Sequence, residues 1–367
     1  MIRKTTVGVV LGIGASMAQA DSVQVYGILD VAVEALNHVG PTGGKLIREP
    51  SLSGGQLPTR LGFRGDEDMG GGWFSRFVLE AGIAPDTGGS LQGGRLFGRQ
   101  AFLGIGQKDL GMVSAGRQWT MTFYSMLDAD VIGPASFGSA ALDPYLPQAR
   151  ADNSVAYRGS YGGWTLGGTY SLGRDTLAPG NCPGETPGKG VNCAEWSTML
   201  KYDTPTWGAA VAYDRQNGGP AGAFIGQPAG TIPSGANADK RLIVDGYVNV
   251  GNAKIGGGWI KRNLLAAPVG LSTDLCFFGT SYPFGTAFSI DAQVLYLHDS
   301  HTASNAQMAV ARGNYALSKN TFLYVMAGHV GNDSKAAYSL SAGGLQSSLP
   351  PAGEGQSGVL VGMRHSF

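Results

Sequence analysis

Histidine is the side chain that most often serves as a general base, and the chain contains five: His38, His298, His301, His329 and His365. Covalent catalysis needs a nucleophile with a base positioned beside it, and none of the five lies in a recognisable nucleophile motif. His298 and His301 are spaced like a pair of metal ligands, but a zinc site needs a further protein ligand, and both lie in a loop just past a predicted strand. We therefore expect no enzyme activity, no catalytic residue, no metal site and no cofactor.

A glycine-rich segment, GDEDMGGGW at 65–73, is the other stretch whose composition could serve chemistry. A phosphate-binding loop would continue into Lys-Ser or Lys-Thr and open a helix. Neither feature is present here, so the segment is predicted to be a tight turn with acidic residues.

The N-terminal residues 1–20 have the composition of a secretory signal peptide. Arg3 and Lys4 are followed by a modest apolar stretch and by Ala18-Gln19-Ala20, a small-x-small cleavage site. A transmembrane anchor is the alternative, but the stretch is too short and too rich in Gly and Ala for that. We predict a mature chain of 21–367 that forms one domain in an exported protein.

Three cysteines remain to be placed in this compartment. Cys182 and Cys193 bracket a loop rich in Gly and Pro, CPGETPGKGVNC, and in an oxidising compartment they can close a disulfide. Two free thiols in this loop are the alternative. Cys276 lies in a strand-like LCFF segment and is expected to be a buried or lipid-facing small apolar residue.

The balance of charges excludes one class of partner. The chain has 26 basic and 26 acidic side chains, so loss of Arg3 and Lys4 leaves 24 basic residues and a net charge of −2. Nucleic-acid binding usually needs a strong basic excess, so no nucleic-acid partner is expected. The sequence after residue 20 contains no run of 18 apolar residues, so no transmembrane helix is predicted. The 60 glycines favour a large sheet with tight turns.

The last ten residues, GVLVGMRHSF, alternate strictly. Val359, Val361 and Met363 fall on one face, and small or polar residues fall on the other. This pattern predicts a strand with one apolar face, ending on the aromatic Phe367. An edge strand of a soluble β-sandwich and the closing strand of an outer-membrane barrel both fit the pattern.

The rest of the chain favours the barrel. Sixteen segments read as strands: 22–36, 57–67, 72–84, 97–107, 110–118, 152–159, 162–172, 195–204, 207–215, 240–251, 253–263, 273–283, 286–298, 306–318, 320–331 and 357–367. Short turns alternate with long connections, at 37–56, 119–151, 173–194, 216–239 and 332–356. Aromatic residues lie at or near strand ends, as in membrane-interface girdles: Trp164, Tyr170, Trp207, Tyr213, Phe288 and Tyr296. We predict an all-β, 16-stranded antiparallel transmembrane β-barrel whose lumen is an aqueous channel.

Several segments resemble the trimeric general porins of Gram-negative bacteria, most closely the β-proteobacterial branch. They span nearly the whole mature chain and include SVQVYGILDVAVE, TRLGFRGDEDMGGGWFSRFVLEAG, GRQAFLGIGQKDLGMVSAGRQ, RADNSVAYRG, YALSKNTFLYVMAGHVGN and GVLVGMRHSF. Each alone is weak, whereas their number, order and spacing are specific. The resemblance implies an outer-membrane homotrimer in contact with lipid, for passive diffusion of small hydrophilic solutes and ions. The terminal Phe367 is then expected to signal assembly to the barrel-assembly machinery.

The resemblance also implies where the constriction lies. In the family the third long loop folds into the lumen, and its acidic groups face arginines on the wall. The matching loop here is 119–149, whose acids are Asp128, Asp130 and Asp143. We expect Asp128 and Asp130 to contribute to the constriction. The matching wall residues are Arg60 in TRLGF, Arg99 in GRQAF and Arg150 in RADNS, with Arg117 in the second GRQ as a fourth candidate.

Opposed charges across a narrow aqueous gap create a transverse field that orders water and disfavours apolar solutes. Rings of arginine favour anions and rings of aspartate favour cations. The family's Pro-Glu-Phe-Gly-Gly segment is Pro134-Ala135-Ser136-Phe137-Gly138 here, so the loop lacks its glutamate. The expected selectivity therefore leans weakly toward anions.

Three alternatives stay open. A channel specific for sugars or small organic anions would carry an aromatic or multi-arginine track, which Phe123, Tyr124 and Tyr145 of the loop could begin. A barrel enzyme would need the catalytic motif that the histidines do not supply. An adhesin would be a plugged, non-conducting barrel.

Overall fold

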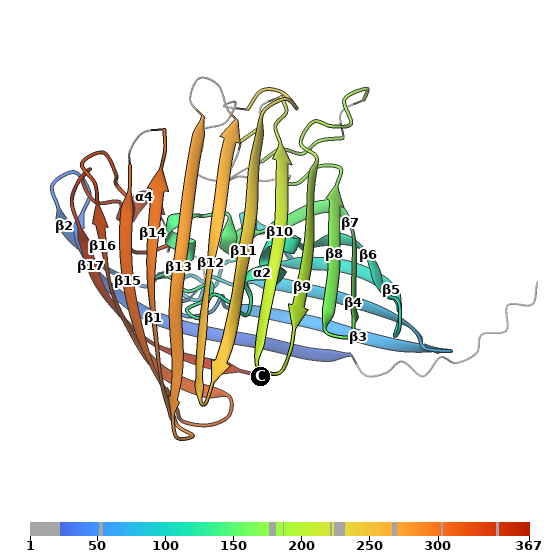
Figure 1. Ribbon diagram of the computed structural model, residues 1–367, viewed down its shortest axis with the longest axis horizontal. Helices are drawn as coiled ribbons and strands as arrows, with labels where there is room; N and C mark the ends of the chain where they lie inside the picture. Colours follow the sequence, from blue (N-terminus) through green and yellow to red (C-terminus); the bar gives the residue numbers. More distant parts are fainter. Residues whose placement is uncertain are drawn as a thin grey trace, which may run out of the picture.

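The computed structural model describes residues 23–50, 54–175, 181–185, 187–220, 222–223, 232–265, 270–301, 304–342 and 345–367. The predicted signal peptide, 1–20, lies outside the described residues. The chain forms one continuous sheet in which β1 pairs with both β3 and β17, so the sheet closes into a barrel (Figure 1).

Seventeen strands make up this sheet, and every pairing is antiparallel. Their bounds are β1 Gln24–Val39, β2 Gly44–Arg48, β3 Arg60–Gly70, β4 Trp73–Gly82, β5 Gln100–Gln107, β6 Gly111–Trp119, β7 Arg150–Tyr161, β8 Trp164–Ser171, β9 Glu195–Asp203, β10 Trp207–Asn217, β11 Ala238–Val250, β12 Ala253–Leu265, β13 Leu271–Phe284, β14 Phe288–Asp299, β15 Ala306–Ala316, β16 Thr321–Asn332 and β17 Gln356–Ser366. The described residues also form four short helices, α1 to α4, and one 3₁₀ turn, η1, all in connections; α1 is Leu91–Gly94 and α4 is Leu345–Ser348.

Sixteen of the strands are the staves of the barrel, and each corresponds to a predicted segment, so the predicted 16-stranded antiparallel barrel is confirmed. The extra strand, β2, is five residues long and pairs with the far end of β1 inside the first long connection. Sequence analysis placed the whole of 37–56 in a loop and therefore missed β2.

The alternating pattern places apolar side chains outward. In β17, Val359, Val361 and Met363 are exposed on the outer face, whereas Leu360 is buried inside. A β-sandwich would bury such a face against a second sheet. One closed sheet with an apolar outer face is the arrangement that leaves neither an open edge nor an unsatisfied backbone group in lipid.

The two ends of the barrel differ as predicted. Short turns join the strands at one end and long connections lie at the other (Figure 1). The C-terminus lies at the short-turn end, where Phe367 exchanges two backbone hydrogen bonds with Gly27 of β1, of 3.0 and 3.1 Å. Trp164, Trp207 and Phe288 begin β8, β10 and β14 at this same end and are exposed, as interface aromatics are.

The connection between β6 and β7, residues 120–149, folds into the barrel and is called the inner loop below. It contains α2 (Met121–Met126), α3 (Ser139–Leu142) and η1 (Leu146–Gln148), and Figure 1 shows α2 inside the ring of strands. Ile132 and Phe137 of the loop belong to one buried apolar cluster with wall residues of β11 to β17: Ile243, Ile260, Leu275, Leu295, Met326 and Leu360. Part of the lumen is therefore a packed core, which corrects the expectation of a lumen that is aqueous throughout.

A disulfide joins Cys182 to Cys193 in the connection between β8 and β9. Cys276 is a free thiol on the exposed outer face of β13. Within the described ranges, no helix combines the length and apolar character needed to cross a membrane.

Candidate functional site

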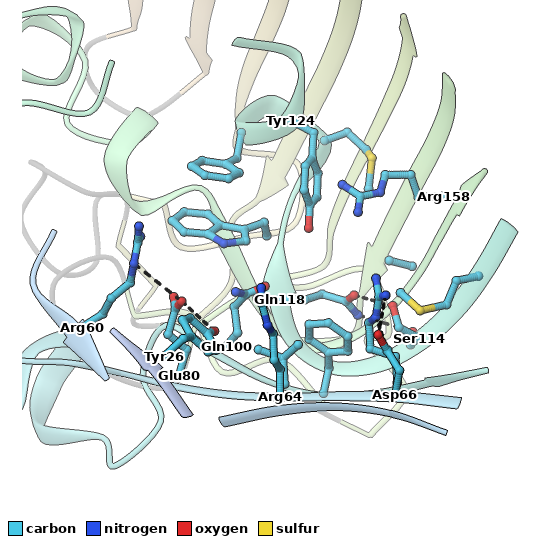
Figure 2. Close-up of a pocket in the computed structure, with 18 of the residues that line it drawn as sticks. Tyr26, Arg60, Arg64, Asp66, Glu80, Gln100, Ser114, Gln118, Tyr124 and Arg158 are labelled. Carbon is cyan, nitrogen blue, oxygen red and sulfur yellow. Dashed lines mark hydrogen bonds and ion pairs between the residues drawn. The ribbon is translucent and has the colours of Figure 1, made fainter. Parts of the chain in front are cut away.

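A cavity of about 700 Å³ lies open in the lumen. It lies between α2 of the inner loop and the inner faces of β1 and β3 to β7 (Figure 2). Because side chains alternate in a strand, residues two apart share the inner face. Arg60, Arg64 and Asp66 of β3 and Arg76 and Glu80 of β4 reach the cavity in this way.

The cavity wall carries more positive than negative charge. Four guanidinium groups line it, from Arg60, Arg64, Arg76 and Arg158, against the two carboxylates of Asp66 and Glu80. This excess of two positive charges is the main electrostatic feature of the passage.

Both carboxylates are already engaged by arginines. Asp66 accepts two hydrogen bonds from Arg76, of 2.6 and 2.9 Å. Glu80 pairs with Arg99 at 2.7 Å and lies 3.9 Å from Arg60. The carboxylates therefore neutralise their own partners and leave the other guanidinium groups available.

Arg64 and Arg158 are those remaining groups. In the part of the chain that the structure describes, neither forms an ion pair with a carboxylate. Arg64 donates from Nε to Gln24 Oε1 at 3.0 Å and lies over the ring of Tyr26, 5.0 Å from its centroid. The Arg158 guanidinium lies 4.0 Å from the centroid of the Tyr124 ring. Figure 2 shows Arg158 beside Tyr124 on one side of the cavity and Arg60 and Arg64 on another.

Of the four arginines that sequence analysis placed at a constriction, only Arg60 lines this cavity. Arg99 and Arg150 are 2% and 4% exposed, and both guanidinium groups pack against the ring of Trp119, at 5.4 and 3.4 Å from its centroid. Arg117 pairs with Asp152 at 2.5 Å and donates to the carbonyl of Gly98. These three residues lie behind Trp119 and outside the lining of this cavity, and a role for them at a constriction stays a prediction.

The predicted acids of the inner loop also lie elsewhere. Asp128 bonds to Lys201 and lies 3.5 Å from Lys254, on strands β9 and β12. Asp130 is buried and accepts hydrogen bonds from the Ser139 hydroxyl at 2.6 Å and from the Gly133 amide at 3.0 Å. Neither lines the cavity, so the two acids do not lie opposite Arg60 there, and their part in a constriction stays a prediction. Basic residues on the far wall attract Asp128 away from the passage.

Aromatic side chains take the place that those acids were expected to fill. Trp119, the last residue of β6, stacks on Phe123 with ring centroids 3.7 Å apart, and Phe123 contacts the Tyr124 ring edge-on at 5.7 Å. We call Trp119, Phe123 and Tyr124 the aromatic shelf. All three line the cavity, together with Phe102 and Tyr26 of the wall. Phe123 and Tyr124, which could begin such a track, line the cavity, whereas Tyr145 is buried elsewhere.

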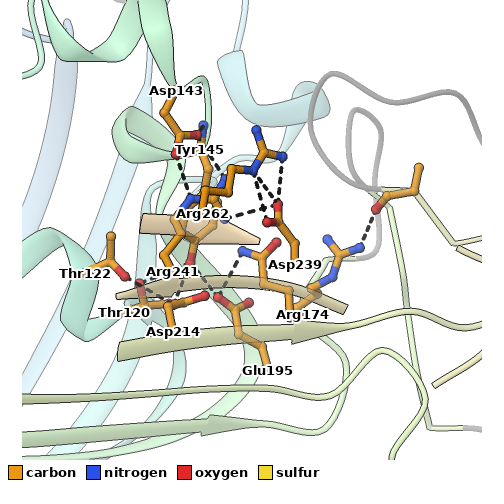
Figure 3. A network of polar contacts seen from close by, with 12 residues as sticks. Thr120, Thr122, Asp143, Tyr145, Arg174, Glu195, Asp214, Asp239, Arg241 and Arg262 are labelled. Carbon is orange, nitrogen blue, oxygen red and sulfur yellow. Dashed lines mark hydrogen bonds and ion pairs between the residues drawn. The ribbon is translucent and has the colours of Figure 1, made fainter. Parts of the chain in front are cut away.

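A second set of contacts anchors the inner loop to the wall opposite the cavity (Figure 3). Asp143 accepts two hydrogen bonds from Arg241 of β11, of 2.7 and 3.0 Å. Burial alone would raise the pKa of the Asp143 carboxyl, but Arg241 and Arg262 outweigh burial and the pKa is lowered. Asp143 is therefore an ionised partner in a buried ion pair.

Tyr145 supplies the neighbouring anchor. Its hydroxyl lies 2.5 Å from Glu195 of β9 and 3.0 Å from Asp214 of β10. Burial raises the pKa of Tyr145 well above its ordinary value, so the hydroxyl keeps its proton and can donate to a carboxylate. Together with Asp143, this contact holds the loop on the β9 to β11 side and leaves the passage on the β1 to β7 side.

Sequence reasoning missed Arg64, Arg76 and Arg158, as well as the anchors. Arg64 could have been predicted from the sequence, because it lies four residues from Arg60 and therefore shares its face of the strand. Arg158 and the anchoring pairs depend on which strand lies opposite the folded loop, and no local pattern reports that.

The chain is similar to known proteins in both sequence and fold. The family model described as Gram-negative porin matches residues 5–335. The chain is 28% identical to outer membrane porin protein 32 of Delftia acidovorans over 96% of each chain. It is 31% identical to an outer membrane porin protein of Bordetella pertussis over 59% of this chain and 60% of the other.

Solved structures share the architecture. An anion-selective porin from Comamonas acidovorans superposes with a TM-score of 0.76 at 24% identity, covering 94% of this chain and 99% of the other. The trimer form of OmpT from Vibrio cholerae superposes with a TM-score of 0.66 at 14% identity, covering 95% of this chain and 100% of the other.

Proposed function

The chain belongs to the Gram-negative porin family, and from this premise we propose that its channel passes small hydrophilic solutes and ions passively with a preference for anions. The protein is an outer-membrane porin, a member of a family of channels rather than enzymes. The anion preference is the part that needs an argument from this chain's own residues.

The observation that carries it is the pairing pattern on the cavity wall. Asp66 and Glu80 are held by Arg76 and Arg99, and Arg64 and Arg158 have no acid partner in the described part of the chain. Unpaired guanidinium groups in a confined passage raise the local concentration of anions and repel cations. A porin of similar fold, from Comamonas acidovorans, is described as anion-selective, which supports the same direction here.

The proposal is tested with purified protein in a planar lipid bilayer separating two KCl concentrations. We expect discrete conductance steps and a reversal potential that has the sign of the chloride equilibrium potential. An absence of steps would contradict the proposed channel. A reversal potential with the sign of the potassium equilibrium potential would contradict the anion preference but not the channel.

We further propose that three copies assemble in the outer membrane, with the exposed apolar face of the barrel against lipid or a neighbouring copy. The trimer form of the structurally similar OmpT supports this arrangement. Chemical cross-linking in mild detergent should give a product of three times the monomer mass. A product no larger than the monomer would contradict the assembly.

Two predictions at the chain ends stay proposals. Cleavage after Ala20 should leave Asp21 as the first residue of the mature protein, which N-terminal sequencing of outer-membrane material reads directly. Recognition of Phe367 by the barrel-assembly machinery should make its removal lower the amount of folded porin in the outer membrane but not the amount exported.

A further inference from the structure

The aromatic shelf is an unexpected lining for a passage that conducts only small ions. A passage that selects only by charge needs hydrophilic walls, because apolar surface in water is unfavourable for hydrated solutes. Here Trp119, Phe123 and Tyr124 line the open cavity; Trp119 is buried beneath Phe123, which stacks on it and meets Tyr124 edge-on. The half-buried rings of Phe123 and Tyr124 therefore offer a solute apolar ring surface inside the cavity.

A guanidinium group without an acid partner in the described ranges adjoins this face. The Arg158 guanidinium lies 4.0 Å from the centroid of the Tyr124 ring. An arginine that stacks on a ring keeps the N–H groups at its edge free to donate, and that edge matches a carboxylate in a two-point hydrogen bond. Arg64 of β3 lies over the ring of Tyr26 of β1 in a similar way, with its guanidinium 5.0 Å from the ring centroid.

We propose that the cavity contains a saturable binding site for small aromatic carboxylates, formed by Arg158 and the aromatic shelf, with Arg64 and Tyr26 as a second contact. The carboxylate of the solute binds the free guanidinium edge, and its ring packs against the half-buried rings of Phe123 and Tyr124. This inference rests on the proposed anion-preferring channel and adds a solute class that charge alone does not select.

Two features of the site point to an aromatic solute rather than to any small anion. The carboxylates that could compete for arginine in the cavity are already bound, Asp66 by Arg76 and Glu80 by Arg99. Apolar side chains extend the shelf around the same space: Val78, Phe102, Met112, Met121 and Ala156. An inorganic anion would use only the guanidinium groups, whereas an aromatic carboxylate uses both kinds of surface.

The test compares three solutes on the same reconstituted channel: benzoate, cyclohexanecarboxylate and benzyl alcohol. Benzoate and cyclohexanecarboxylate share charge and approximate size and differ in the flat ring. Benzyl alcohol keeps the ring and lacks the charge. The readout is the solute concentration that halves the chloride conductance.

We expect benzoate to block saturably at a concentration about fivefold lower than cyclohexanecarboxylate, the ratio expected from one added aromatic contact. Benzyl alcohol should block far more weakly than either acid. Tyr124→Leu should bring benzoate close to cyclohexanecarboxylate, and Tyr124→Phe, which keeps the ring, should preserve the difference. Arg158→Gln should weaken the block by both acids.

Arg215→Gln is the matched control. Arg215 shares the outward-facing register of Trp207 and Val211 in β10 and has no place in the cavity, so its removal should leave all three blocking concentrations unchanged. Conductance steps in KCl show for each variant that a folded channel is being measured.

The outcomes separate the two proposals. Equal blocking by benzoate and cyclohexanecarboxylate in a channel that still prefers chloride would overturn the aromatic site and leave the anion preference standing. A channel that prefers potassium would overturn the anion preference itself. Retention of the benzoate advantage in Tyr124→Leu would overturn the assignment to the shelf.

Discussion

At the scale of residues, the partner of each arginine decides its role more than its presence in the lumen does. Arg76 and Arg99 line or support the wall with their charge neutralised by Asp66 and Glu80. Arg64 and Arg158 keep theirs. A count of arginines along the chain treats all of these residues alike, whereas the field in the passage depends on the unpaired ones.

The Asp143–Arg241 pair is the residue-scale contact that positions the inner loop. Asp143→Asn removes one of the two carboxylates that pair with the buried Arg241 and leaves only Asp239, at 3.1 Å. Because a buried charge loses a partner, we expect a loss of roughly 3 kcal/mol in the free energy of unfolding. Urea unfolding in lipid vesicles measures the loss, and single-channel current should become noisier as the loop moves. Asp68→Asn, on an exposed pair with Lys108, is the control and should change neither. A quiet, fully stable Asp143→Asn channel would show that the pair does not hold the loop.

The same pair predicts a pH dependence. The pKa of Asp143 is lowered on folding, from an ordinary value of 3.8. A carboxyl of this kind stabilises the fold above its unfolded pKa, and the contribution is lost as the pH falls through the lower folded value. The stability difference between the wild type and Asp143→Asn should therefore stay constant from about pH 8 to about pH 5 and shrink only below about pH 4. A difference that shrinks between neutral pH and about pH 5 would assign the effect to another group.

At the scale of elements, the sixteen staves could be predicted from alternation alone because each strand shows its own period in its own residues. Segment 357–367 corresponds to β17 at Gln356–Ser366 in this way. Strand β2 could not be predicted so, because its five residues form a strand only by pairing with β1. The inner loop was placed by resemblance, and its contacts with β9, β10 and β11 depend on distant parts of the chain.

The closure of β1 on β17 gives an element-scale prediction. A Cβ atom on Gly27 would lie 2.3 Å from the Phe367 ring and 2.8 Å from the Arg60 carbonyl oxygen. Gly27→Ala should therefore lower the yield of folded barrel when the purified chain refolds in detergent, measured by heat-modifiable mobility in gels. In this refolding, which does not use the assembly machinery, Phe367→Ala should partly restore the yield by removing the ring. Gly331→Ala in β16, where the nearest atom is 4.0 Å away, is the matched control and should fold normally. Equal yields for Gly27→Ala and Gly331→Ala would show that close packing at the seam does not limit folding.

At the scale of the whole molecule, the barrel has two unlike halves. The inner loop packs its apolar residues against β11 to β17 and bonds to β9, β10 and β11, so that side is packed apart from a smaller cavity of about 240 Å³ between the loop and β12 to β14. The passage is left on the side of β1 and β3 to β7, where the unpaired arginines and the aromatic shelf lie. Selectivity is thus a property of one side of the lumen. That side is the one opposite the strands to which the inner loop binds.

The most direct test of this account is the reversal potential of the double variant Arg64→Gln with Arg158→Gln in a KCl gradient, beside the wild type and Arg215→Gln. The account predicts a clear shift of the double variant toward zero, because the two unpaired charges of the passage are gone. Arg215→Gln should match the wild type. An unchanged reversal potential in a double variant that still conducts would contradict the claim that these arginines set the selectivity of the passage.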